Sequence, residues 1–295
     1  MTSAPLSAPP VDVSEHSGVE FGRSAEDFPV ARVGDLFFAL LTGQRDQHFL
    51  ASAWRARRPL AELRRDDFYS HDGPVADEAA FRNRMIEHAE QSRQLAALSR
   101  QAVRMNCNTP WGPSHGATVY ADGVVAHTTA GHGGFVLSPA RNAKVHPMLR
   151  AVDGWYEEDV CWAAVALTFP DLFTTYERRC AERTIKDSFP NAWESITGEA
   201  LLPGESDTKD RRVFENEHAA DWIVTSAILS DHCPGMTEVI AVLGGKDAAG
   251  KEERRFLVPS TEYNVGRFGF VIDQDHHEAY DGPSSFIGWQ RRRAS

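Results

Sequence analysis

Residues 111–159 read WGPSHGATVYADGVVAHTTAGHGGFVLSPARNAKVHPMLRAVDGWYEED and contain the chain's densest group of reactive residue types. Two short runs within it, residues 117–120 and 124–128, flank Asp122-Gly123, a dipeptide favoured in two-residue hairpin turns. A third run, residues 135–137, follows the glycines between 131 and 134. The pattern predicts a small antiparallel sheet in the middle of the chain.

Helical signals follow this stretch. Ser138-Pro139 predicts the start of a short helix, because serine is a favoured N-cap and proline fits the first helical position. Residues 155–170 carry apolar side chains on nearly every face, which predicts a buried helix. Two more helices are expected at residues 172–186 and 191–197, before a polar loop at 205–212.

The last part of the chain is rich in β-branched residues. Four such runs predict strands at residues 221–230, 237–245, 253–259 and 268–273, and their short connections favour an antiparallel meander. The order of strands, helices and strands predicts an α+β fold with a mainly antiparallel sheet. We therefore assign residues 106–290 to an α+β domain and residues 291–295 to a basic tail.

The N-terminal part is predicted to be different. Residues 1–28 are rich in proline, serine, alanine and acidic residues, which is typical of a disordered tail. Residues 29–105 are interpreted as a helical region, because the apolar residues between 33 and 41 share one face at helical spacing. A second helix is expected from about residue 44 to Pro59.

A long helix is predicted at residues 77–105, with Asp77 as its N-cap. Its apolar face is thin, so the helix must lie against a partner. That partner could be the following domain or a second copy of the chain, which would make a homo-oligomer.

Composition limits the function. The 42 acidic residues outnumber the 31 basic ones, and a net charge of −11 disfavours direct binding to nucleic acid or anionic membranes. The basic cluster around Arg55–Arg65 is interleaved with acidic residues and is interpreted as a solvated face. The chain lacks both the roughly 18 apolar residues of a membrane span and the pattern of a secretory signal, which predicts a cytoplasmic protein. Four widely spaced cysteines predict free thiols.

The candidate reactive residues allow a metal hypothesis. His127, His132 and His146 with Asp159 are suitable ligand types for zinc or iron. Their spacing matches no familiar ligand motif, and His127 and His132 would point to opposite faces of a continuous strand. No metal is favoured, and the sequence identifies no cofactor.

A loop hypothesis rests on Gly131, Gly133, Gly134 and Ser138 around His132. Glycines allow positive φ and close approach of a ligand, and successive amides can form an anion-binding nest. The alternative is a tight hairpin with an incidental histidine.

A catalytic hypothesis makes His132 a general base, with Thr128, Thr129 or Ser138 as candidate nucleophiles and the acidic run as an orienter. The candidate catalytic residues are His132, His127, His146, Glu157 and Glu158. The alternative for the acidic run is capping of the following helix.

Residues 111–134, 137–150 and 154–173 resemble an uncharacterised domain family found in plasmid and integrative-element proteins, chiefly of rhizobia and related alphaproteobacteria. The similarity continues through ADWIVTSAILS (220–230) and ERRFLVPSTEY (253–263) to GPSSF (282–286), and covers about residues 106–288. It implies a bacterial mobile-element setting and no reaction. Relatives carry glutamine in place of His115, which argues against His115 as a ligand.

Two function classes remain open. The first is a non-enzymatic accessory protein of a mobile element that binds a protein partner, for instance to counter a defence system. The second is a hydrolase, with or without a metal, built on the histidines and acids around His132. The acidic balance, the long helix and the family resemblance favour the first.

Overall fold

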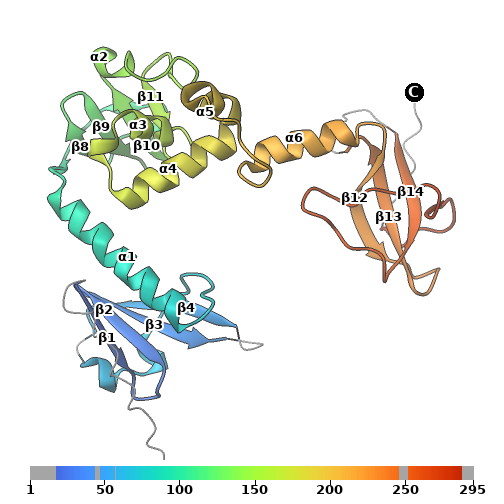
Figure 1. Cartoon of the computed structure of the whole chain (residues 1–295), viewed down its shortest axis with the longest axis horizontal. Helices are drawn as coiled ribbons and strands as arrows, with labels where there is room; N and C mark the ends of the chain where they lie inside the picture. The colour runs from blue at the N-terminus through green and yellow to red at the C-terminus, as the bar shows by residue number, and fades with distance from the viewer. Residues whose placement is uncertain (1–17, 44–46, 57, 246–251, 288–295) are drawn as a thin grey trace, which may run out of the picture. The chain divides into compact units, whose positions relative to one another are not determined.

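The computed structural model describes residues 18–43, 47–56, 58–245 and 252–287 (Figure 1). The chain forms two compact units, Met1–Arg183 and Thr184–Ser295. Strands dominate the described part, where they form four antiparallel sheets. This overturns the predicted α+β architecture with a helical N-terminal region. Residues 1–17 of the predicted tail and the basic tail at 291–295 lie outside the described residues.

The first sheet lies within residues 19–54, which were predicted to be a disordered tail up to residue 28 and helical from residue 29 onwards. Its strands are β1 (Val19–Arg23), β2 (Pro29–Val33), β3 (Leu36–Thr42) and β4 (His48–Trp54), paired in that order. Phe38 and Leu40 of β3 enter one core cluster, while Phe37, Ala39 and Leu41 enter another on the opposite face. A strand buried on both faces has a continuous apolar run without alternation, and such a run can match a helical pattern.

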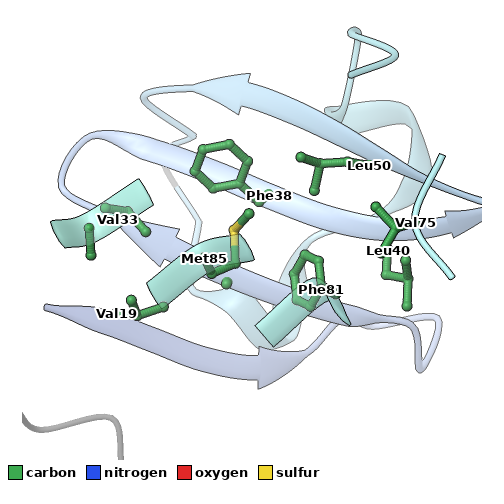
Figure 2. Close-up of a cluster of buried hydrophobic side chains, with 10 residues drawn as sticks. Val19, Val33, Phe38, Leu40, Leu50, Val75, Phe81 and Met85 are labelled. Carbon is green, nitrogen blue, oxygen red and sulfur yellow. The ribbon is translucent and has the colours of Figure 1, made fainter. Parts of the chain in front are cut away.

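One face of this sheet is covered by α1 (Glu78–Ala97), whose buried residues Phe81 and Met85 pack on it (Figure 2). Ala89 of the same helix belongs to the same core cluster. The helix begins where predicted, since Asp77 Oδ1 accepts the Ala80 amide at 2.7 Å. It ends eight residues before 105, because residues 101–103 form β5 (Gln101–Val103). The opposite face is covered by the segment with η3 (Leu60–Glu62) and η4 (Arg65–Asp67).

The second sheet carries the candidate residues. Its order is β11-β10-β9-β8-β5, with β8 (Gly116–Ala121), β9 (Val124–Thr128), β10 (Gly133–Leu137) and β11 (Trp155–Glu157). The β8–β9 hairpin turns at Gly123, which has a φ of 71°, as the Asp122-Gly123 signal predicts. A two-stranded sheet of β6 (Asn108–Thr109) and β7 (Gly112–Pro113) precedes β8.

The helices after β10 are shorter than predicted. Ser138 caps α2 (Pro139–Asn142) by accepting the Arg141 amide, as the Ser-Pro signal indicates. The buried helix is α3 (Trp162–Thr168), since the first residues of its predicted range form β11. It leads through η5 (Pro170–Leu172) to α4 (Thr175–Ser188).

The second unit contains α5 (Pro190–Thr197), α6 (Asp207–Glu217) and a meander of β12 (Trp222–Leu229), β13 (Met236–Leu243), β14 (Glu253–Pro259) and β15 (Glu278–Ala279). The predicted polar loop at 205–212 is wrong, because Ser206 caps α6 through the Lys209 amide. The predicted strand at 268–273 is also wrong as a sheet strand, since the segment makes one bridge, Val271 to Ile223, with backbone hydrogen bonds on either side of it to Trp222 and Val224. The core includes Trp222, Val239 and Phe256.

Candidate functional site

His132 lies in the tight turn that joins β9 to β10. The register pairs Gly133 with Thr128 and Gly134 with His127, so the turn is residues 129–132. Thr129 closes it, because its amide and hydroxyl both donate to the His132 carbonyl, at 2.9 and 2.6 Å. The His132 amide donates to the Thr129 hydroxyl at 3.2 Å, so it is already paired within the hairpin. The His132 side chain is exposed.

The glycines of this hairpin serve close packing. Gly133 and Gly134 are buried strand residues, and Gly131, Gly133 and Gly134 all lie outside the set of glycines with positive φ. A Cβ on Gly134 would meet the Tyr156 carbonyl at 2.3 Å and the Trp111 indole at 2.4 Å. A Cβ on Gly133 would meet Glu158 Oε2 at 2.4 Å, whereas nothing lies within 4 Å at Gly131. Gly134 therefore lets β11 and Trp111 pack against β10, and Gly133 leaves room for the Glu158 side chain.

The acidic run meets His132 at the end of β11. Ligand atoms of His132, Glu157 and Asp159 all lie within 4.8 Å of one another. Both Glu157 oxygens are also used locally: Oε1 accepts the Asp159 amide at 2.6 Å and Oε2 accepts the Val160 amide at 3.1 Å. These bonds hold the carboxylate in place, as second-shell contacts do for metal ligands. The group has the residue types of a divalent-cation site, with two exposed members.

His127 lies in a different, buried environment. Its Nδ1 is 3.1 Å from Ser114 Oγ and 3.7 Å from Cys107 Sγ, and its ring is 5.6 Å from that of Trp155. Ser114 Oγ donates to the Gly116 carbonyl, so the shared proton of the His127–Ser114 bond comes from Nδ1. Burial lowers the pKa of His127, which favours the neutral ring.

His146 and Ser138 are each hydrogen-bonded in their own surroundings. His146 Nδ1 accepts the Met148 amide at 3.3 Å. Ser138 caps α2 at the far end of β10, about 20 Å of extended strand from His132. Glu158 is exposed, and its amide donates to the Gly133 carbonyl at 3.1 Å. Of the sequence-predicted residues, the fold thus brings His132, Glu157 and Asp159 together and leaves His127, His146 and Ser138 apart from them.

Two ion pairs, one half-buried and one buried, were not predicted from the sequence. Arg100 donates to both oxygens of Glu177 at 2.9 and 2.7 Å and lies 4.1 Å from the centre of the Tyr120 ring. Burial alone would raise the pKa of Glu177, but the hydrogen bonds from Arg100 and Thr174 and the charge of Arg100 outweigh it and lower the pKa. Pairing of distant residues leaves no local signal in a sequence.

The second pair lies in the sheet of the second unit. Glu238 of β13 is fully buried, and Arg255 of β14 donates to it at 2.7 Å. The Ser284 hydroxyl and the Ser285 amide also donate to Glu238, so the carboxylate ties residues 284–285 to the sheet. Burial opposes the charge, but these donors outweigh it and lower the pKa of Glu238.

Each unit also contains a cavity. In the first, a space of about 480 Å³ lies between α1 and the sheet, lined by Phe38, Leu50, Met85 and His88. The His88 ring packs edge-on against Phe38, with ring centres 5.0 Å apart. Burial, and then the charge of Arg84, lower the pKa of His88. His88 lies three residues after Met85 on the helix, a spacing that places both on one face.

In the second unit, a space of about 380 Å³ lies beside β12. Its walls come from β12, from residues 263–269 and from the last turns of α6.

Comparison with known proteins finds one family model that matches part of the chain. Residues 104–219 match the model of a domain of unknown function, DUF7007. This match supports the resemblance to an uncharacterised domain family. Neither the curated proteins nor the solved structures gave a significant match. Within the described residues, every helix is too short or too polar to cross a bilayer.

Proposed function

We propose that the chain is a non-enzymatic accessory protein of a bacterial mobile element, of plasmid type and alphaproteobacterial origin, that acts in the cytoplasm by binding a protein partner. Countering a host defence system is the role that best fits this setting. The support is the family resemblance together with one structural observation. The reactive side chains around residues 111–159 are largely committed to structural hydrogen bonds.

That commitment is seen residue by residue. His127 is buried against Ser114, Glu157 holds the turn before α3, and Ser138 caps α2. A general base or nucleophile must have a free reacting atom within hydrogen-bond reach of a substrate. Because these side chains are used in this way, we infer that residues 111–159 mainly stabilise the fold. The function then lies at a surface that binds a partner.

The test is purification of the tagged chain from the bacterium that encodes it. We expect a partner protein at fixed stoichiometry, which re-forms the same complex when both purified proteins are mixed and analysed by light scattering. A single species of monomer mass, obtained with and without the mobile element in the cell, would overturn the proposal.

A second candidate, a metal-dependent hydrolase, is favoured by the cluster of His132, Glu157 and Asp159. A cation held there would supply an activated water, and Glu157 would be oriented by its two amide bonds. Equilibrium dialysis with Zn²⁺ and with Mn²⁺ tests this candidate.

Binding to this cluster should weaken more than about tenfold in His132→Ala and Asp159→Asn, since loss of an ordinary outer-shell partner already costs 10 to 100-fold. His146→Ala is the matched control and should bind as wild type does. Equal binding by all the variants, or none by the wild type, would remove this candidate.

A further inference from the structure

The first strand of the second unit's sheet, β12, is an edge strand that is covered over only half its length. The Val224 amide donates to the Phe270 carbonyl at 2.8 Å, and the Ile272 amide donates to the Trp222 carbonyl at 2.8 Å. Residues 270–272 therefore pair with residues 222–224. The ladder between β12 and β13 then shifts at a bulge between Val224 and Ser226.

Beyond the bulge the edge is open. The Ser230 amide donates to Met236 of β13, so the alternate residues Ala227 and Leu229 direct their N–H and C=O groups away from β13. Within residues 18–43, 47–56, 58–245 and 252–287, these groups have no hydrogen-bond partner. Ile228 and Leu229 are 37% and 69% exposed.

The composition of this edge is unusual for a solvated strand. Residues 222–229 read WIVTSAIL and contain no charged residue and no proline. Natural edge strands are normally protected from pairing by lysine, proline, bulges or a cover. Within the described residues, the bulge and the cover by residues 270–272 protect the first half of β12, and the four residues 226–229 lie beyond both. An edge of this kind is a template for another strand.

The cavity of about 380 Å³ lies along the same edge and would receive a side chain of an added strand. Phe214 of α6 and Phe268 contribute rings to its walls, 5.8 Å apart. Arg267 in the wall pairs with Asp207 and Asp210 at 2.8 and 2.9 Å, so its charge is balanced. A large uncharged side chain therefore suits the cavity.

The charges around the open edge indicate the flanks of the occupant. The cavity wall contains Glu215 and two arginines, Arg211 and Arg267, which pair with Asp207 and Asp210. The exposed Asp231 follows the edge by two residues. The whole chain carries a net charge of −11. A basic residue next to the apolar segment would be attracted to this rim.

We propose that residues 225–229 accept an extended peptide segment of a partner protein as an added strand. The segment alternates apolar side chains, places one large uncharged side chain in the cavity, and carries a basic residue beside the acidic rim. Backbone hydrogen bonds supply affinity and the cavity supplies specificity. This inference rests on the proposed function, because it names the kind of partner that a binding protein would take.

The probe is a phage-displayed library of random 12-residue peptides, selected on the full-length chain. Enriched peptides are synthesised and titrated by fluorescence anisotropy. Ala227→Pro removes an outward N–H without removing a ladder bond to β13, since proline is tolerated on an open edge. Ala227→Thr keeps the N–H and is the matched control.

We expect enriched peptides to bind Ala227→Pro at least tenfold more weakly than wild type, and Ala227→Thr within twofold. N-methylation of alternate peptide amides should abolish binding only for those facing β12, and this series needs no change in the protein. The N-methylated peptide series therefore tests the inference even when the Ala227→Pro protein does not fold.

Three results would overturn the inference. One is equal binding of the peptides to the proline and threonine variants, and another is equal enrichment on the proline variant. The third is protection of the Ala227 and Leu229 amides from hydrogen exchange in the chain alone. Protection that grows with concentration would mean that a second copy covers the edge, and constant protection would mean that the chain covers it itself.

The outcomes also separate this inference from the proposed function. A natural partner that binds the Ala227→Pro protein as tightly as the wild type would leave the proposed function intact and overturn the edge site. Peptides that bind at the edge of β12 when no natural partner is recovered would support the edge site and overturn the proposed function.

Discussion

At the scale of single residues, the surroundings of a side chain depend on its place in the paired strands and turns, and residues close in sequence can have different roles. His127 and His132 are five residues apart, yet one is buried against Ser114 and the other is exposed in the turn. Asp159 is far along the chain from His132 and lies beside it, because β10 pairs with β11. The candidate cluster is a product of strand register.

The first residue-scale prediction concerns Gly134. Gly134→Ala should lower the free energy of unfolding by about 1–3 kcal/mol, because the added methyl would overlap the Tyr156 carbonyl and the Trp111 indole. Gly131→Ala, with no atom within 4 Å of its Cβ position, should stay within about 0.5 kcal/mol. Urea denaturation followed by tryptophan fluorescence measures both. Equal midpoints would contradict this packing role.

The second residue-scale prediction concerns the buried pair of Glu238 and Arg255. Arg255→Met should destabilise the second unit by about 3–5 kcal/mol, because it leaves the buried carboxylate without its cation. Glu252→Gln, which breaks the exposed pair with Arg254, should cost about 0–1 kcal/mol. Thermal unfolding measured by calorimetry compares them. A smaller loss for the arginine variant than for the glutamine variant would refute this reasoning.

At the scale of elements, the sequence predicted caps and turns correctly, but it did not predict the strands that are buried on both faces. The cap at Asp77, the hairpin at Gly123 and the Ser138 cap depend on neighbouring residues, and all are present. The strands β2 to β4 were predicted as helices, because burial of both faces removed their alternation. Burial on two faces depends on distant segments, which include α1 and η3.

The element-scale prediction concerns α1. Asp77→Ala should destabilise the first unit by about 1 kcal/mol, because the Ala80 amide loses its acceptor. Asn83→Ala, at an exposed position inside the helix, should change the unfolding free energy by less than about 0.5 kcal/mol. Chemical denaturation monitored by circular dichroism measures the difference. No difference between the two variants would show that the cap contributes nothing.

The buried face of α1 also bears on assembly. Phe81, Met85 and Ala89 pack on the sheet of the same chain, so this face already has its partner. Homo-oligomerisation through residues 77–105 stays a prediction, and it would have to use the other faces of the helix.

At the scale of the whole molecule, pH should control stability through a few buried and half-buried groups. His88 and His127 have folded-state pKa values lowered by burial, so the unfolded chain binds their protons more readily. The contribution of these two histidines to the free energy of unfolding is complete above the unfolded-state pKa of about 6.5, and it is lost as the pH falls below that value. Glu177 and Glu238 also have lowered pKa values, and their contribution is lost as the pH falls through the acidic range below about 4.5.

We therefore expect the free energy of unfolding to fall in two steps as the pH is lowered from 8 to 3. His127→Gln should reduce the first step and leave the second. Urea denaturation at each pH tests this, with circular dichroism as the readout. A first unit equally stable at pH 8 and pH 5.5 would contradict the assignment of His88 and His127.

The sequence by itself determined the features that depend on neighbouring residues, which are the caps, the turns, the strands flanking Asp122-Gly123 and the meander of β12 to β14. It also located the stretch in which His132 and the acids meet. Tertiary structure alone decided which histidine joined them, because strand pairing sets which side chains share a face. It likewise decided the four N-terminal strands and the open edge of β12. Burial and pairing are relations between distant residues, and no single stretch of sequence contains them.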